Sequence, residues 1–323
     1  MKYFLSILIV FLSLQLLSQE RTDRSNQPVE LGKVSWYRDY DEALKVATRE
    51  KKAVLILFQE VPGCATCRNY GHNVLSHPLM VEAIENLFIP LTIFNNKGGK
   101  DRAVLNKYDE PSWNNPVVRV VNGVGWDVIP RVSGNYSVIG LYQAMEKSLK
   151  AQGKEIPEYM SLLKADLLTF NTSKIKEKYY KMYCFWSGEK HLGAKEGVLS
   201  AKAGFMDGYE VVKVTYDADE IEERTLNQYA RQAQISEIAD NGQYRYSDKD
   251  HLFYLRKSPY QYLPLTELQK TRINSALGSG TSPRKYLSPR QLHWLDHLTP
   301  QQGKLTTLID KDIEAAWDLK AGL

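Results

Sequence analysis

The sequence predicts two domains of the α/β and α+β classes behind a short apolar leader. With 43% hydrophobic and 25% charged residues among 323, the chain has an ordinary globular composition and is long enough for two cores. Amphipathic segments of helical period alternate with short apolar runs of strand length. This alternation stops at a polar stretch, residues 150–158, that contains Gly153 and Pro157. Because it then begins again, we expect the domain boundary there.

Charge and cysteine content exclude several classes of protein. The chain has 42 Lys and Arg against 38 Asp and Glu, a net charge of +4, without a basic block of five or more residues. Nucleic acid is therefore not an expected partner. The three cysteines are too few for a disulfide-stapled scaffold or an all-cysteine zinc site, and their odd number leaves at least one thiol without a permanent partner.

Residues 1–18 have the pattern of a secretory signal peptide. A cation at Lys2 precedes a mainly apolar run over 3–17, and the small polar Ser18 follows. A membrane anchor is the competing interpretation, but this run is shorter than the roughly 20 residues that a spanning helix needs. We expect export to the periplasm or the extracellular space, an oxidising compartment, and no stable membrane association after cleavage. Residues 21–27 are expected to form a polar, flexible lead-in.

A cysteine pair follows the first predicted strand. The amphipathic stretch 41–50 predicts a helix, and the continuous apolar run 53–58 predicts a buried strand. Residues 61–67 then read Val-Pro-Gly-Cys-Ala-Thr-Cys and lead into a segment compatible with a helix. Cys64, at the first turn of that helix, would meet exposed N–H groups and the positive end of the helix dipole, which stabilise a thiolate. The spacing to Cys67 allows the pair to close into a disulfide.

Three further elements complete the first domain. Residues 87–94 and 116–121 are predicted strands, the second leading into a hairpin turn at Asn122 and Gly123. Residues 138–149 have the period of a final amphipathic helix.

Over residues 34–153 this pattern resembles the thioredoxin-like family. The resemblance implies that Pro116 is a cis-proline that faces the Cys-x-x-Cys pair. The Val-Pro-Gly-Cys-x-Thr-Cys form is similar to the branch of that family whose first redox position is often selenocysteine. It implies that Cys64 is the attacking thiol and Cys67 the resolving thiol.

Two metal-containing alternatives compete with a redox pair. Cys64 and Cys67 with His72 and His77 offer two plus two zinc ligands at short spacing. The strand-turn-helix setting favours exchange over zinc binding, because it orients the pair. Haem attachment is excluded, since Arg68 stands where a histidine is required.

A third cysteine opens a helix in the second domain. Strands are predicted over 178–183, 197–205 and 210–216, with a turn at 206–208 and a helix over 218–233. Cys184 ends the first of these strands and opens a short helix through Ala194, which again favours an activated thiolate.

These residues resemble the A-type peptide methionine sulfoxide reductases. The resemblance rests on Cys-Phe-Trp-x-x-Glu at 184–189, on Gly-Tyr-Glu-Val-Val-Lys-Val-Thr-Tyr-Asp at 208–217, and on the segment 246–260. It implies that the nucleophile is Cys184, that a pocket for the substrate methyl group is walled by Phe185 and Trp186, and that the acid that protonates the sulfoxide oxygen is Glu210. The chemistry needs these types of residue, because the oxygen leaves only when it is protonated.

The sequence also departs from that family. The loop between the two central strands is shortened, so Tyr209 is the candidate for its tyrosine. Asp240 and Tyr244 are candidates for a later Asp and Tyr pair. Leu263 stands in the place of the resolving cysteine, which implies that this domain cannot regenerate itself.

The predicted organisation is a signal peptide at 1–18, a thioredoxin-like domain at 30–153, a linker at 154–174, a methionine sulfoxide reductase A-like domain at 175–263 and a helical C-terminal extension at 264–323. The leading hypothesis is an exported thiol-dependent reductase of methionine-S-sulfoxide in proteins, with electrons relayed from the Cys-x-x-Cys pair. It needs an oxidised protein or peptide substrate and an external thiol or disulfide reductant, and no cofactor or metal. The alternative is a thiol-disulfide oxidoreductase whose C-terminal half is a catalytically degenerate peptide-binding module. A third reading makes both cysteine sites inert structural thiols.

Overall fold

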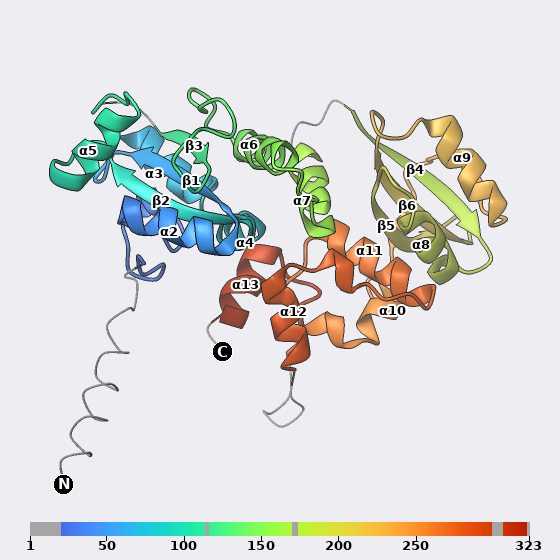
Figure 1. The fold of residues 1–323 in the computed structure, drawn as a ribbon. Helices are drawn as coiled ribbons and strands as arrows, with labels where there is room; N and C mark the ends of the chain where they lie inside the picture. The colour runs from blue at the N-terminus through green and yellow to red at the C-terminus, as the bar shows by residue number, and fades with distance from the viewer. Residues whose placement is uncertain (1–20, 114–115, 170–173, 299–305, 322–323) are drawn as a thin grey trace, which may run out of the picture. The chain divides into compact units, whose positions relative to one another are not determined.

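The computed structural model describes residues 21–113, 116–169, 174–298 and 306–321 (Figure 1). The chain divides into two compact units, Met1–Gln152 and Gly153–Leu323. The predicted signal peptide lies outside the described residues. In the part of the chain that is described, no helix has both the length and the apolar character needed to cross a membrane.

The first unit is built on a sheet with strand order β2-β1-β3 in the described residues. β1 is parallel to β2 and antiparallel to β3. The elements are η1 (Val29–Leu31), α2 (Tyr40–Glu50), β1 (Ala53–Gln59), α3 (Ala65–Asn73), α4 (Pro78–Leu87), β2 (Phe88–Phe94), α5 (Gly99–Lys107), β3 (Val117–Val121) and α6 (Val138–Ala151). The strands and helices predicted for this unit are confirmed, with ends that differ by a few residues.

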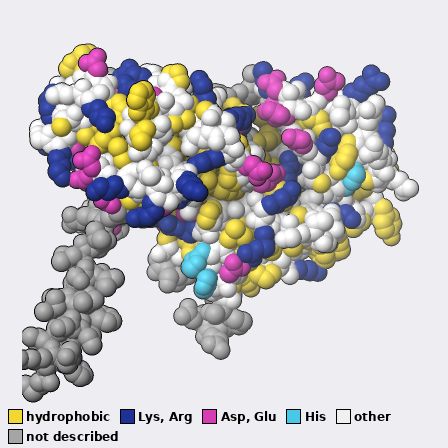
Figure 2. Space-filling view, in the orientation of Figure 1, with side chains coloured by type: hydrophobic (Ala, Val, Ile, Leu, Met, Phe, Trp, Pro, Cys, Tyr) yellow, Lys and Arg dark blue, Asp and Glu magenta, His cyan; other side chains and the backbone are white. Residues whose placement is uncertain are grey.

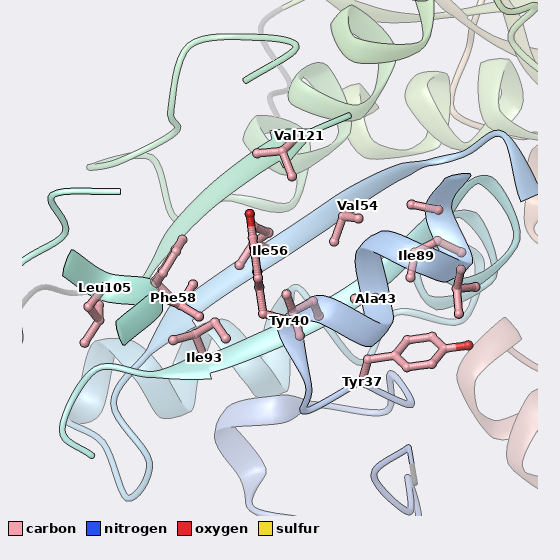
Figure 3. Close-up of a cluster of buried hydrophobic side chains, with 14 of the residues drawn as sticks. Tyr37, Tyr40, Ala43, Val54, Ile56, Phe58, Ile89, Ile93, Leu105 and Val121 are labelled. Atoms are coloured by element: carbon pink, nitrogen blue, oxygen red, sulfur yellow. The ribbon is translucent and has the colours of Figure 1, made fainter. Parts of the chain in front are cut away.

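The core of this unit forms around β1. Every residue of β1 is buried, as its continuous apolar sequence predicts for a central strand. Ile56 of β1 shares one buried cluster with Ala43 of α2 and Ile93 of β2 (Figure 3). α2 begins where the Asp39 carboxylate accepts a hydrogen bond of 3.1 Å from the Glu42 N–H, a typical N-cap.

The segment 21–27 is packed, so the prediction of a flexible lead-in is wrong. Arg24 forms an ion pair of 2.8 Å with Glu85 of α4. The Arg21 guanidinium donates a hydrogen bond of 3.0 Å to the Ser35 carbonyl. The polar composition of this segment predicts flexibility, but the side chains of Arg21 and Arg24 both bind partners in the folded unit.

The second unit has an antiparallel sheet with strand order β7-β4-β6-β5-β8 in the described residues. The elements are α7 (Glu158–Thr169), β4 (Ile175–Met182), α8 (Phe185–Gly193), β5 (Val198–Met206), β6 (Tyr209–Asp217), α9 (Glu223–Gln232), β7 (Ser236–Ile238), β8 (Arg245–Tyr246), α10 (Phe253–Arg256), η2 (Pro259–Tyr262), α11 (Glu267–Gly278), η3 (Arg284–Tyr286), α12 (Pro289–Asp296) and α13 (Ile313–Ala321). α8 and α11 both pack on β5, and α7 packs against α11.

Two turns bound strand β6. β5 and β6 are joined by Asp207 and Gly208, whose φ angles of 52° and 77° suit a two-residue hairpin turn. After β6, the Asp217 carboxylate accepts a hydrogen bond of 2.9 Å from the Asp219 N–H, which forms a local turn. The helix predicted to begin at residue 218 therefore begins at Glu223.

Charge is interspersed on the surface. On the face drawn in Figure 2, Lys and Arg side chains are spread among acidic ones and do not gather in one block. This distribution agrees with the absence of a basic block in the sequence.

Candidate functional site

The first candidate site lies between β1 and α3. β1 ends at Gln59, and Cys64 is the N-cap of α3. One turn of helix brings Cys67 beside it, and the two Sγ atoms are 3.5 Å apart. Cys64 is exposed whereas Cys67 is buried. A bulky disulfide can therefore reach Cys64, and Cys67 can be reached through Cys64.

The two thiols differ in acidity as well as in exposure. Hydrogen bonds from the Cys67 backbone N–H, the Cys67 thiol and the Thr66 N–H lower the pKa of the Cys64 thiol. Burial, together with the hydrogen bond to Cys64, raises the pKa of Cys67 to about 12. Cys64 is thus the more acidic thiol of the pair, as its place at a helix start predicts.

Side chains from outside the motif hold the loop before Cys64. The buried Glu30 accepts a hydrogen bond of 2.8 Å from the Gly63 N–H. Arg68 donates a hydrogen bond of 2.8 Å to the Gly63 carbonyl. Asn96 accepts one of 3.2 Å from the Val61 N–H. This support fixes the approach of the loop to the helix.

Two glycines allow close contacts that this arrangement requires. A Cβ on Gly63 would lie 2.4 Å from the Glu60 carbonyl oxygen and 3.1 Å from the Cys67 Sγ. A Cβ on Gly71 would lie 1.9 Å from the Val29 carbonyl oxygen. The first lets the loop pass close to the buried sulfur, and the second lets α3 pack against η1, which carries Glu30.

Comparison with known proteins assigns the part of the chain that contains this site. A family model described as thioredoxin-like matches residues 35–123. Residues 35–123 form a thioredoxin-like domain. A solved structure titled "DsbH Oxidoreductase" is also similar, with a TM-score of 0.33 and 14% sequence identity, over 39% of this chain and 90% of that chain. No curated protein matches this chain.

The thioredoxin-like domain contains three other residues that the sequence singled out. Pro116 directly precedes β3 and is buried, but the peptide bond before it joins residue 115, which lies outside the described residues. His72 is exposed in the last turn of α3, and His77 is the N-cap of α4. Among the described residues, neither histidine lies close enough to both cysteines to share a metal ion with them. The carboxylate of Glu60 does, within 4.8 Å of both sulfurs.

The second candidate site lies at the start of α8. Cys184 is the half-buried N-cap of α8. The Glu210 carboxylate accepts a hydrogen bond of 2.8 Å from the Phe185 N–H. Glu210 is paired with Met182 in the register of β4 and β6, so the sheet brings this predicted acid to the helix start that holds the predicted nucleophile.

Aromatic rings surround that helix start. Phe185 makes edge contacts with Trp186 and Phe205, at centroid distances of 6.0 and 5.4 Å. Phe253 stacks on Trp186 at 3.9 Å. The Trp186 indole N–H is buried and has no acceptor among the residues described. Sequence reasoning missed Phe253, although it lies within the matched segment 246–260.

The other predicted polar residues have partners elsewhere. Tyr209 is 50% exposed, and the Lys181 ammonium lies 4.6 Å from its ring centroid. Asp240 accepts a hydrogen bond of 2.9 Å from the Gly242 N–H. Tyr244 donates one of 2.7 Å to the Lys202 carbonyl. Within the described part of the chain, no hydrogen bond or ring contact links these three side chains to Cys184 or Glu210.

One further tyrosine belongs to the surroundings of Cys184. Burial raises the pKa of Tyr254, and the neighbouring Cys184 raises it further, so the Tyr254 hydroxyl lies near this cysteine. Leu263, which the sequence resemblance places at a resolving-cysteine position, is buried in an apolar cluster with Leu255 and Ile273. α8 itself is anchored by the buried Glu189, whose carboxylate accepts a hydrogen bond of 2.9 Å from the Ala203 N–H.

Proposed function

We propose that the chain is a thiol-disulfide oxidoreductase that acts through Cys64 and Cys67 on disulfides of proteins or peptides. The observation that carries the proposal is the asymmetry of the pair. Cys64 is exposed at a helix start and has a lowered pKa, and its Sγ lies 3.5 Å from that of the buried Cys67. The fold of residues 35–123 supports it.

The reaction consists of two exchanges. The Cys64 thiolate attacks one sulfur of the substrate disulfide and releases the other as a thiolate. Cys67 then attacks the Cys64 Sγ, releases the second substrate sulfur, and passes its proton to that leaving thiolate. The substrate gains two electrons and the Cys64–Cys67 pair becomes a disulfide. An external thiol or dithiol restores the pair.

A reduction assay on a fluorescent disulfide-linked peptide, with dithiothreitol as the reductant, tests this proposal. We expect Cys64→Ser to abolish the rate above the reductant's own, and Cys67→Ser to accumulate a mixed disulfide with the peptide. Cys184→Ser is the matched control and should retain the full rate. A Cys64→Ser protein as fast as wild type would contradict the proposal.

A second activity is supported by the contact between Glu210 and Phe185. We propose that Cys184 reduces methionine-S-sulfoxide. Its thiolate attacks the sulfoxide sulfur while Glu210 supplies the proton to the departing oxygen. Methionine and the sulfenic acid of Cys184 are the products. The half-buried thiol at the start of α8, the carboxylate bound at the next residue and the aromatic rings support this assignment.

Regeneration of Cys184 then depends on the first domain. A sulfenic acid condenses with a thiol and releases water, and Cys64 and Cys67 are the other cysteines of the chain. Tethering within one chain gives a thiol an effective concentration that can reach millimolar. We propose that Cys64 attacks oxidised Cys184 and that Cys67 then releases Cys184.

Reduction of a methionine sulfoxide peptide of defined epimer tests the second activity. With dithiothreitol, we expect turnover of the S epimer and not of the R epimer, and loss of turnover in Cys184→Ser. Saturable peptide binding without turnover would favour the alternative, in which the C-terminal half is a degenerate peptide-binding module.

A further inference from the structure

Glu60 turns the cysteine pair into a group of three potential metal ligands. Its carboxylate oxygen and the Sγ atoms of Cys64 and Cys67 all lie within 4.8 Å of one another. Glu60 is half-buried in the loop between β1 and α3. Among the described residues, the Glu60 carboxylate forms no hydrogen bond or ion pair that would compete with a metal ion.

We propose that the reduced thioredoxin-like domain binds one Zn²⁺ through Cys64, Cys67 and Glu60. The site uses the same sulfurs as the proposed exchange reaction but does not depend on that reaction. Its three ligands leave the fourth position of a tetrahedral ion to water or an external ligand, because Cys64 faces solvent.

The spacing of the donors suits zinc. Two thiolates bound at about 2.3 Å in a tetrahedral site lie about 3.8 Å apart, and the two Sγ atoms are already 3.5 Å apart. A carboxylate oxygen binds zinc at about 2.0–2.2 Å, and the Glu60 oxygen already lies within 4.8 Å of both sulfurs. Soft thiolates also select zinc over calcium and magnesium, which prefer oxygen ligands.

The surroundings favour the charge of such a site. Two thiolates and a carboxylate exceed the charge of the ion by one negative unit. The N-terminus of α3, at which Cys64 is the N-cap, offers the positive end of a helix dipole. Zinc replaces the protons of the thiols, which pass to solvent.

Zinc binding has a chemical consequence for the pair. While both sulfurs are bound, neither is available for attack on a disulfide. Exchange therefore begins only after the ion dissociates and frees the Cys64 thiolate. The substrate disulfide then takes two electrons and becomes two thiolates, while Cys64 and Cys67 form a disulfide that cannot bind the ion again. Bound zinc would thus hold the pair reduced and inactive until the ion dissociates.

The test is titration of the reduced, full-length protein with Zn²⁺ in competition with a chromophoric chelator. We expect one ion per reduced chain, none per oxidised chain, and release of protons on binding. Glu60→Gln should weaken binding by about tenfold or more, since a ligand is lost. Cys184→Ser should bind as wild type does, because Cys184 is not a ligand.

The histidine variants distinguish this ligand set from the one that sequence spacing allowed. His72→Ala and His77→Ala should leave the affinity unchanged. If either weakens binding while Glu60→Gln does not, the assignment of Glu60 is wrong. Absence of saturable binding to the reduced chain also overturns the proposal.

Two further measurements separate loss of the zinc ligand from loss of the fold. Wild-type protein loaded with Co²⁺ in place of zinc should show thiolate charge-transfer bands and the absorption bands of a tetrahedral ion. This measurement tests the ligand set without any substitution. Near-ultraviolet circular dichroism checks that Glu60→Gln is folded. Peptide reduction measured with chelator present reports on disulfide exchange alone, so loss of zinc binding and loss of exchange are separate outcomes.

Discussion

The Glu210 carboxylate receives a 2.8 Å hydrogen bond from the Phe185 backbone N–H, at the residue that follows Cys184. This contact links the start of β6 to the first turn of α8. It holds a group that can carry a proton close to a half-buried thiol. The Phe185 N–H is one of the free donors at the start of α8, so this contact orients the carboxyl group toward the cysteine end of that helix.

Replacement of this carboxyl group tests its role as an acid. We expect Glu210→Gln to lower the rate of sulfoxide reduction by about a hundredfold. The amide oxygen can still accept the Phe185 N–H, so alkylation of Cys184 by a small reagent should change little. Tyr209→Phe is the matched control. An unchanged rate in Glu210→Gln would move the proton-donor role to Tyr209 or Tyr244.

The proposed relay leaves a covalent record. In a Cys67→Ser protein, the attack of Cys64 on oxidised Cys184 has no resolving thiol, so the intermediate should stall as a Cys64–Cys184 disulfide. Mass spectrometry of a non-reduced digest after one turnover detects it. Product without this cross-link would mean that a second molecule or an external thiol serves Cys184.

Gly63 should tolerate no side chain. A Cβ there meets the Glu60 carbonyl oxygen at 2.4 Å, so Gly63→Ala must shift the loop. We expect a loss of about 1–3 kcal/mol in the free energy of unfolding, measured by urea denaturation, and slower peptide reduction. Gly98→Ala is the control, because a Cβ on Gly98 meets nothing within 4 Å. Equal stability of the two variants would contradict the packing argument.

The lowered pKa of Cys64 predicts the pH dependence of its alkylation. The reactive thiolate fraction rises with pH, so a lowered pKa moves the curve to lower pH than that of an ordinary thiol, whose pKa is about 8.5. In metal-free Cys184→Ser protein, we expect fast alkylation of Cys64 near neutral pH. Cys67, with a pKa of about 12, should stay unreactive.

The hydrogen bond from the Cys67 thiol has a separate test. Cys67→Ala removes this donor and keeps the backbone N–H of residue 67, so the alkylation curve of Cys64 should move part of the way to higher pH. A curve that does not move would assign the acidity of Cys64 to backbone N–H groups and the helix dipole alone.

The sequence by itself determined the parts of this protein that depend on local chemistry. The continuous apolar run 53–58 predicts a buried strand whatever packs against it, and β1 is buried throughout. Residues 64–67 place two sulfurs at the start of a helix, because one helical turn separates them. The position of Cys184 between a predicted strand and a predicted helix likewise placed its thiol at a helix start. Glu210 lies 25 residues from Phe185 in the chain, a separation that no local pattern connects, so only the resemblance to a known family pointed to it.

Only the tertiary structure decided which distant side chains complete each site. Glu30 reaches Gly63 across 33 residues, and Phe253 covers Trp186 from another helix. The sequence also pointed to His72 and His77 as companions of the cysteines, whereas the fold turns Glu60 toward the sulfurs. Short spacing in the chain does not fix where a side chain lies in space. That is set by the packing of helices and strands, which joins residues with no common period.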